Sequence, residues 1–207
     1  MMRTIAAICA VGMASALLAG CQSVVPGSYV PDPKLSARDQ QMMALAPSSE
    51  SSIPIYRVEI GDPTGQSPGT IVIDTSAKNL YFVLPGKKAI QYRVATGAEA
   101  YGWTGEARVG RMTEWPTWMP TASIMERWPE FKAYIAHGPL AGAYDNPLGA
   151  RALYLYQGNQ DTLYRIHGTN EPDEIGQSVS SGCIRMRDLD VIDLYNRVKV
   201  GTKVVVL

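Results

Sequence analysis

The pattern of apolar and polar positions predicts a series of short β-strands from Gly69 onward. β-branched and aromatic residues gather in three stretches, which are separated by polar turns containing Ser, Asn, Pro or Gly. This pattern is typical of a β-meander, in which each strand pairs with the next one along the chain. The three predicted strands cover residues 70–73, 80–84 and 90–95.

A hairpin is predicted at 151–157 and 162–167, where Tyr and Leu are frequent and a Gly-Asn turn signal separates the two runs. Because side chains alternate between the faces of a strand, Leu163, Arg165 and His167 are expected on one face of the second strand. His167 then stands at the end of the hairpin.

A helix is predicted at 188–198, because apolar residues recur there at helical spacing and form one stripe. Asp188 is expected to cap its start, and Gly201 follows its end. An apolar run at 203–207 predicts an interior strand. Strand pairing with few helices predicts a mainly β domain of β-sandwich-like architecture with one short C-terminal helix.

The segment 97–149, between the meander and the hairpin, is longer than an ordinary connection, and we expect a Trp-rich lid or subdomain with a short helix near Pro120. Tryptophan more often fills a core than contacts a ligand, so most of its rings are expected in the core. His137 precedes a glycine, as His167 does, but no strand comes before it, and a surface or lid position is expected. The segment holds all four tryptophans of the chain, Trp103, Trp115, Trp118 and Trp128.

Residues 21–68 are rich in Pro, Ser and polar residues, and this composition predicts a tether with one short helix inside. The helix is expected to begin at Ser36, whose spacing to Asp39 resembles a capping box, and to end near Leu45. The alternative is an extension packed on the domain, which apolar residues at 53–58 favour for its last part.

Residues 1–20 resemble a bacterial secretory signal, with Arg3 followed by an apolar run that is short for a membrane-spanning helix. The run ends in Leu-Ala-Gly-Cys, which resembles the lipobox of bacterial lipoproteins. Cys21 is therefore expected to be the lipidated first residue of the mature chain. The alternative is a plain signal peptide cleaved near Ala19, with Cys21 a spare thiol.

Length and charge limit the remaining possibilities. A chain of 207 residues suffices for one domain with extensions, which we place at 69–207, and its core needs no disulfide support. Lys plus Arg and Asp plus Glu both number 19, and no basic run occurs, which argues against a nucleic-acid partner. The chain has no phosphate-binding loop or dinucleotide fingerprint, and we expect no cofactor.

The chemistry is expected at His167-Gly168 and in the stretch Ser180 to Arg185, which reads SSGCIR. A cysteine nucleophile attacks as the thiolate, so Cys183 needs an imidazole to take its proton and hold the resulting ion pair. Gly182 suits a sharp turn, and the backbone N–H groups of Gly182 and Cys183 could stabilise an oxyanion.

Two other interpretations exist for this pair. The first is a buried structural cysteine with a core histidine, against which the two glycine-containing turns argue. The second is a zinc site, but the chain has no Cys-x-x-Cys and no His-x-x-x-His spacing, so no metal is expected.

The two motifs together resemble the signature of the YkuD-type L,D-transpeptidases, bacterial enzymes that remodel peptidoglycan. The resemblance runs from about Gly69 to Leu207 and includes Asn-Pro-Leu-Gly at 146–149 and the closing residues 204–207. Many members of that family carry His in place of Ser181 and Asn in place of Arg185, so the chain departs from the pattern there.

The resemblance implies the same β-sandwich-like domain and a thioester mechanism. Cys183 would cleave the bond before the fourth-position D-Ala of a tetrapeptide stem, with His167 as the base, and carbapenems would trap the thiol. The acyl group would pass to an amine, by cross-linking stems, anchoring a protein to the wall or exchanging a D-amino acid. Ser181 and Gly182 are assigned to the oxyanion loop, and Gly168, Ser180 and Arg185 to substrate binding, where Arg185 could instead brace the loop.

The expected partners are peptidoglycan stems, with outer-membrane proteins as possible acyl acceptors. A lipid at Cys21 would anchor the protein in the cell envelope, and Gln22 in place of Asp favours the inner leaflet of the outer membrane. Two other function classes stay open: a thiol carboxypeptidase or endopeptidase, and a non-catalytic wall-binding lipoprotein. The Cys–His pair argues against the last and does not separate the hydrolase from the transferase.

Overall fold

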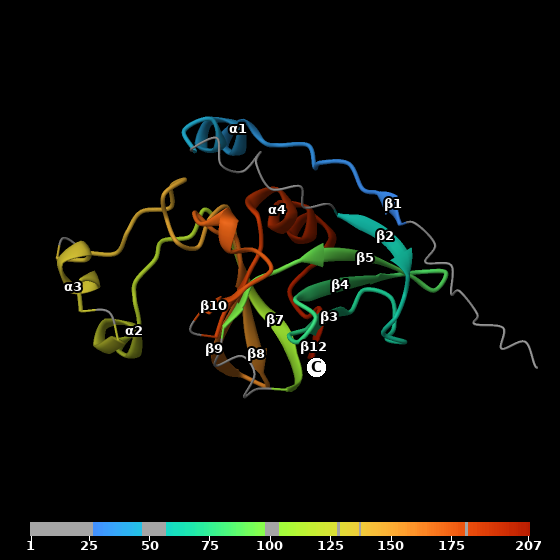
Figure 1. Ribbon diagram of the computed structural model, residues 1–207. Coiled ribbons are helices and arrows are strands. Elements are labelled where there is room, and N and C mark those ends of the chain that lie inside the picture. Colours follow the sequence, from blue (N-terminus) through green and yellow to red (C-terminus); the bar gives the residue numbers. More distant parts are fainter. Residues whose placement is uncertain (1–26, 47–56, 98–103, 128, 137, 181) are drawn as a thin grey trace, which may run out of the picture.

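The computed structural model describes residues 27–46, 57–97, 104–127, 129–136, 138–180 and 182–207, and Figure 1 shows the arrangement of their elements. The four α-helices of these residues are α1 (Ala37–Met43), α2 (Ala122–Arg127), α3 (Phe131–Tyr134) and α4 (Asp188–Arg197). The first six strands are β1 (Ser28–Tyr29), β2 (Val58–Gly61), β3 (Ile71–Asp74), β4 (Asn79–Leu84), β5 (Lys88–Arg93) and β6 (Thr96–Gly97). The others are β7 (Gly105–Glu114), β8 (Arg151–Gln157), β9 (Gln160–His167), β10 (Ser178–Ser180), β11 (Ile184–Arg185) and β12 (Lys203–Val206).

One mixed sheet contains ten of these strands in the order β1-β2-β5-β4-β3-β12-β7-β8-β9-β11, and β10 pairs separately with β6. The C-terminal strand β12 lies in the interior of the sheet, parallel to β3 and antiparallel to β7. The predicted meander, hairpin, C-terminal helix and interior closing strand are therefore confirmed, as is the mainly β class.

Strand alternation explains why one core forms. Successive core residues are two positions apart, as in Ile71 and Ile73, or Leu153 and Leu155, so each strand turns one face inward. Strands from β5 across to the β11 edge of the sheet contribute, together with Val191 and Leu194 of α4. The helix covers the inner face that the sheet would otherwise expose.

The alternation fails at one predicted position. Leu163 has a φ of 64° and is 67% exposed, and the β8–β9 register shifts between Tyr154 and Tyr156. This irregularity in the ladder takes Leu163 out of the row in which Arg165 and His167 were expected with it.

Strand β7 was missed, because it lies inside the segment 97–149 that was predicted to be a lid. Its inward residues, Ala107 and Val109, are small or separated by charged residues, so no apolar run marks the strand. It nevertheless pairs with both β12 and β8. Only the part after β7 stands apart, and Figure 1 shows its helices α2 and α3 on the opposite side of the molecule from β1 and β2.

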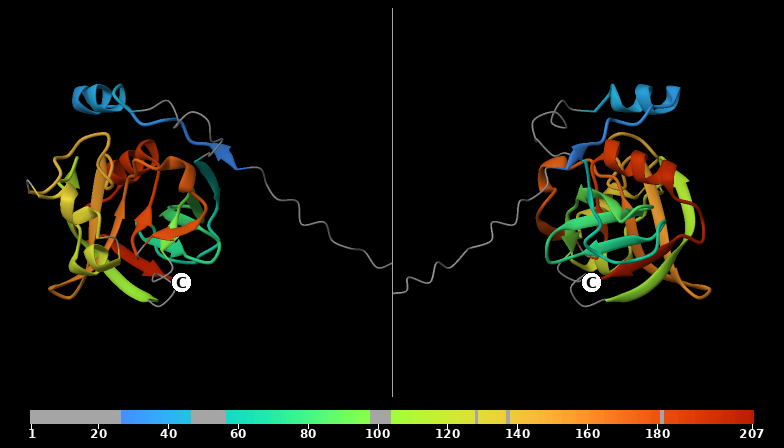
Figure 2. Two further views of the ribbon diagram at one scale, coloured as in Figure 1. Left: turned by 60° about the vertical axis from the view of Figure 1, so that its left-hand side comes forward. Right: turned by 90° about the vertical axis from the view of Figure 1, so that its right-hand side faces the viewer.

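Described residues of the predicted tether pack on the domain, so the tether interpretation is wrong for them. β2 pairs with β5, and the short β1 pairs with β2. Helix α1 begins after Ser36 with the predicted capping box, and in both views of Figure 2 it lies on the same side of the molecule as α4. The alternative of a packed extension describes residues 27–46 and 57–68.

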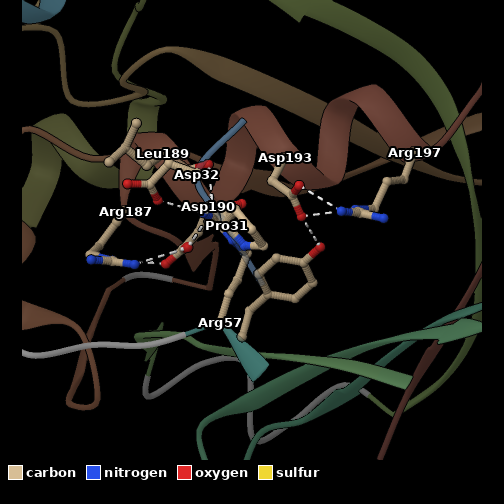
Figure 3. A network of polar contacts seen from close by, with 9 residues as sticks. Pro31, Asp32, Arg57, Arg187, Leu189, Asp190, Asp193 and Arg197 are labelled. Atoms are coloured by element: carbon tan, nitrogen blue, oxygen red, sulfur yellow. Dashed lines mark hydrogen bonds and ion pairs between the residues drawn. The ribbon is translucent and has the colours of Figure 1, made fainter. Parts of the chain in front are cut away.

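A buried arginine fastens this extension to α4 (Figure 3). Arg57 is 1% exposed, and its Nη1 lies 2.9 Å from Oδ1 of the buried Asp190 and 2.8 Å from the carbonyl oxygen of Leu189. Its Nη2 donates to Asp32 at 2.6 Å. Asp190 also receives two hydrogen bonds from Arg187. A guanidinium thus joins the upstream segment to the start of α4.

We predict that Arg57→Met lowers the free energy of unfolding by on the order of 3 kcal/mol, because it leaves a buried carboxylate short of a partner. Lys88→Ala is the control, since its ion pair with Glu59 has 58% and 34% exposed side chains and is expected to contribute only about 0–1 kcal/mol. Urea unfolding measures both variants. Equal losses would contradict the assignment of Arg57 as the anchor.

Candidate active site

His167 ends β9 and is held between two strands. It is 4% exposed, lies opposite Ala152 of β8 in the antiparallel ladder, and lies beside Arg185 of β11 in a parallel one. The Met186 N–H donates to the His167 carbonyl at 2.8 Å, which continues the second ladder. The backbone of the histidine is therefore fixed from both sides.

The histidine ring is oriented by the next peptide. Nδ1 of His167 lies 2.6 Å from the carbonyl oxygen of Gly168. A carbonyl only accepts hydrogen bonds, so Nδ1 carries the proton and Nε2 has its lone pair available. This is the tautomer that a general base acting through Nε2 requires.

Gly168 is needed for steric reasons. A Cβ at this position would lie 2.0 Å from Oδ1 of Asp188 and 2.9 Å from the nitrogen of Ala150. The same Asp188 oxygen accepts the N–H groups of Ala150 at 2.9 Å and Thr169 at 3.3 Å. Asp188 was expected to cap α4, but it is the first helical residue and its carboxylate instead holds the loops around His167.

Cys183 lies in the turn between β10 and β11. Gly182 before it has a φ of 126°, a conformation open mainly to glycine, and a Cβ there would lie 3.1 Å from the ring of Tyr164. Ile184 after it pairs with Ile166, so the parallel register brings Cys183 alongside the end of β9. Cys183 is partly exposed and forms no disulfide.

His167 and Cys183 line one cavity of about 450 Å³. Arg185 lines it as well, so the structure brings together the three side chains to which the sequence assigned chemistry. Another part of the cavity lining comes from the segment after β7, where the rings of Trp118 and Phe131 pack edge to face with centroids 5.3 Å apart. Asn146, 1% exposed, ties this segment together by donating to the carbonyl oxygens of Pro116 at 3.1 Å and Ala141 at 2.8 Å.

Burial favours the neutral form of both His167 and Cys183. Burial lowers the pKa of His167 to about 3, and the positive charges of Arg185 and Arg165 act in the same direction against the Gly168 hydrogen bond. Burial also raises the pKa of the Cys183 thiol, against the effects of the Arg165 backbone and of both arginine charges. The expected resting ion pair is therefore disfavoured, and a neutral thiol faces a neutral imidazole.

Arg185 is engaged by two carboxylates that sequence analysis missed. Its Nη1 lies 2.9 Å from Glu171 and also contacts Glu174, and both acids line the cavity. Glu174 belongs to a 3₁₀ turn, Pro172–Glu174, between β9 and β10. No sequence spacing marks these acids, because their role depends on β11 folding back beside β9. These contacts hold the Arg185 side chain beside the cysteine turn.

Comparison with known proteins identifies the family of this chain. The family model YkuD, L,D-transpeptidase catalytic domain, matches residues 68–206. The chain belongs to this family. Among curated relatives, the Probable L,D-transpeptidase YcfS of Escherichia coli is 38% identical over 144 residues, which are 65% of this chain and 42% of that protein. The Putative L,D-transpeptidase YqjB of Bacillus subtilis is 30% identical over 149 residues, covering 70% and 76%.

The L,D-transpeptidase domain thus spans less than half of the Escherichia coli relative. Solved structures agree on the fold: that of an Enterococcus faecium L,D-transpeptidase mutant has a TM-score of 0.50, with 18% identity over 68% of this chain and 50% of that one. A Brucella melitensis structure named Probable carnitine operon oxidoreductase caia is 43% identical over 77% of this chain and 99% of that one, with a TM-score of 0.51. Its name differs from those of the curated relatives.

Several positions to which the sequence analysis assigned a role lie outside the residues that the structure describes. Ser181, Cys21, His137, Trp103 and Trp128 are outside the described residues, as is the whole of 1–20. Ser180 ends β10, whose parallel partner across the small sheet is Gly97. Of the other two tryptophans, Trp115 is 3% and Trp118 is 9% exposed, so both belong to the buried interior, as expected for most.

Thiol alkylation as a function of pH tests the neutral pair. Because the thiol pKa is raised, the thiolate fraction of Cys183 should grow about tenfold per pH unit through neutrality and up to the ordinary thiol range. The iodoacetamide rate, read at Cys183 by peptide mass, is expected to follow it. A rate that is already level below pH 7 would show a resting ion pair instead.

Proposed function

We propose that this L,D-transpeptidase domain transfers the acyl group of a peptidoglycan stem through a thioester on Cys183. The observation that carries the proposal is that the thiol and a histidine with Nδ1 held by the Gly168 carbonyl line the same cavity. A nucleophile and an oriented base sharing one cavity are what covalent acyl transfer requires.

The acylation step begins from the neutral pair. Nε2 of His167 takes the thiol proton as the sulfur bonds to the carbonyl carbon before the fourth-position D-Ala. The C–N bond then breaks, and His167 returns the proton to the departing amine of D-Ala. In the second half, an acceptor amine attacks the thioester, His167 takes its proton, and the thiolate leaves and is reprotonated.

Two further features support this chemistry. Gly182 places the backbone at Cys183 in a sharp turn, and we assign the N–H groups of that turn to the tetrahedral oxyanion. Arg185 stabilises the same loop through Glu171 and Glu174. Its positive charge also opposes protonation of His167, which keeps the base in its active form.

We expect Cys183→Ala and His167→Ala each to abolish release of D-Ala from a tetrapeptide muropeptide, because one removes the nucleophile and the other its base. Mass analysis of the products also identifies the acceptor. A cross-linked dimer or an exchanged D-amino acid indicates transfer, and a shortened stem indicates hydrolysis.

Near-UV circular dichroism should show that both variants stay folded. Leu163→Ala is the control, since its side chain is 67% exposed and does not line the cavity. Turnover retained in folded Cys183→Ala would exclude the thioester mechanism, and a wild-type protein that binds stems without turnover would favour the non-catalytic alternative.

The location of the protein is a second part of the proposal, motivated by the Leu-Ala-Gly-Cys sequence at 18–21. A diacylglyceryl group plus an N-acyl chain on Cys21 would exceed the two lipid signals that stable anchoring needs. Because described packing begins at Gly27, six residues from Cys21, the link to the domain would reach at most about 20 Å. The domain would therefore lie close to the membrane, where outer-membrane proteins are candidate acceptors. No helix in the described part of the chain is long and apolar enough to cross a membrane.

Cys21→Ser is predicted to move the protein from the membrane to the soluble fraction after cell lysis, because the lipid would have no attachment site. Labelling with a fatty-acid probe should be lost in the same variant, and Cys183→Ser should keep both properties. A Cys21→Ser protein that still sediments with membranes would contradict lipidation at this residue.

A further inference from the structure

Asp39 is a buried carboxylate on α1, outside the 68–206 range of the family domain. It is 1% exposed and accepts hydrogen bonds from three side chains. Arg151 binds it through two parallel contacts of 2.9 Å, Nη1 to Oδ1 and Nη2 to Oδ2. Nε1 of Trp115 donates to Oδ1 at 2.9 Å, and Oγ of Ser36 to Oδ2 at 2.7 Å. The N3 residue of the α1 capping box is thus bonded to the domain itself.

Arg151 carries this contact into the sheet. It is 3% exposed and is the first residue of β8, and its Nη1 also donates to the carbonyl oxygen of Ala150 at 2.8 Å. Its own backbone carbonyl accepts the N–H of Gly168 at 3.0 Å. The side chain that binds Asp39 and the carbonyl that binds Gly168 belong to the same residue.

The Gly168 peptide completes the connection to the base. Its N–H is held by Arg151, and its carbonyl oxygen lies 2.6 Å from Nδ1 of His167. Asp39, Arg151, Gly168 and His167 therefore form a continuous series of contacts, each no longer than 3.0 Å. No side chain fits at this glycine, because Asp188 and Ala150 leave no room for a Cβ beside it.

Apolar packing supports the same connection. Leu35, Met42 and Met43 of the upstream segment pack against the cluster of Trp115, Ala150 and Ile192. Ala150 precedes Arg151 and donates its N–H to Asp188. The upstream segment thus packs against Ala150, beside Gly168, and also binds the Arg151 side chain through Asp39.

We propose that Asp39 is a positioning residue for His167, acting through Arg151 and the Gly168 peptide, so that a segment upstream of the family domain sets the tautomer of the base. The inference rests on the proposed function for the role of His167 as base. Without Asp39, Arg151 would be a buried cation whose Nε already has no partner among the described residues. Such a guanidinium moves toward water, because an unpaired buried charge is unfavourable. The start of β8 and the Gly168 peptide would shift with it.

The test is Asp39→Asn in the full chain, with Asp32→Asn as the matched control. Asp32 lies in the same upstream segment and pairs with Arg57, but its side chain is 54% exposed and contacts no part of the Gly168 series. Nitrogen-15 spectra of labelled histidine report the tautomer directly, and His137→Gln assigns the signals because the chain has only two histidines. Steady-state kinetics on the muropeptide give kcat and KM separately.

Asp39→Asn is expected to reduce the Nδ1–H population of His167 and to lower kcat by on the order of tenfold, with KM within about twofold, because misplacement of a base weakens the chemical step. Asp32→Asn should leave the spectrum and kcat at wild-type values. A loss of thermal stability in Asp39→Asn with an unchanged tautomer and kcat would overturn the proposal, and so would equal effects in the two variants.

Trp115→Phe covers the case in which Asp39→Asn does not fold. It removes one of the hydrogen bonds to Asp39 and keeps the Arg151 pair, so a smaller change of tautomer in the same direction is expected. An unchanged tautomer in this variant would overturn the proposal. The spectrum requires no substrate. A wild-type protein without turnover would therefore count against the proposed function, while the response of the His167 signal to Asp39→Asn would still decide the positioning role.

Discussion

The parallel pairing of β11 with β9, through two residues on each strand, sets the geometry on which the site depends. Ile184 and Arg185 of β11 pair with Ile166 and His167 of β9, and the cysteine turn immediately precedes this contact. Such a short ladder is weak by itself, so other contacts must hold the loop. Two backbone hydrogen bonds of 2.9 Å join Arg185 to Ala95 on its other side, and the Arg185 side chain binds two acids. Cys183 is thus placed by a strand that has a partner on each side.

The electrostatics of the site follow from this placement. Pairing β11 with β9 puts a guanidinium beside the histidine, and burial removes the water that would stabilise an imidazolium. Burial raises the pKa of the Cys183 thiol for the same reason, so the protonated thiol is favoured at neutral pH. Burial therefore favours an unprotonated His167, and the arginine adds to that effect.

Local patterns in the sequence predicted the local structure well. The β-branched runs became β3, β4 and β5, the capping box formed at Ser36, and the apolar stripe became α4. Cys183 and His167 could be singled out because both are rare residues set beside glycine. These features depend on neighbours within a few positions, which sequence periodicity reports directly.

The missed features depend on residues far apart in the chain. Arg57 and Asp190 are 133 positions apart, and Asp39 and Arg151 are 112 apart, so no local pattern announces either pair. Strand β7 was missed for a different reason, because its partner strands supply the apolar surface that its own sequence lacks. The Pro- and Ser-rich composition that predicted a tether indicates only that long helices and strands are absent. It carries no information on single side chains, such as Asp39 and Arg57, that bind the segment to the domain.

These long-range ion pairs change where the folding unit begins. The family match starts at residue 68, yet β2 extends the sheet upstream of it and two buried guanidinium–carboxylate pairs bind the segment further. Burial would raise the pKa of Asp39, but hydrogen bonds from Arg151, Ser36 and Trp115 lower it to about 2. Because this folded-state pKa is below the ordinary 3.8, the stabilisation is complete above that value and is lost as pH falls toward 2. At neutral pH the charge that holds the upstream helix in place is therefore permanent, and the helix is as much a part of the domain as β9 and β11, which position His167 and Cys183.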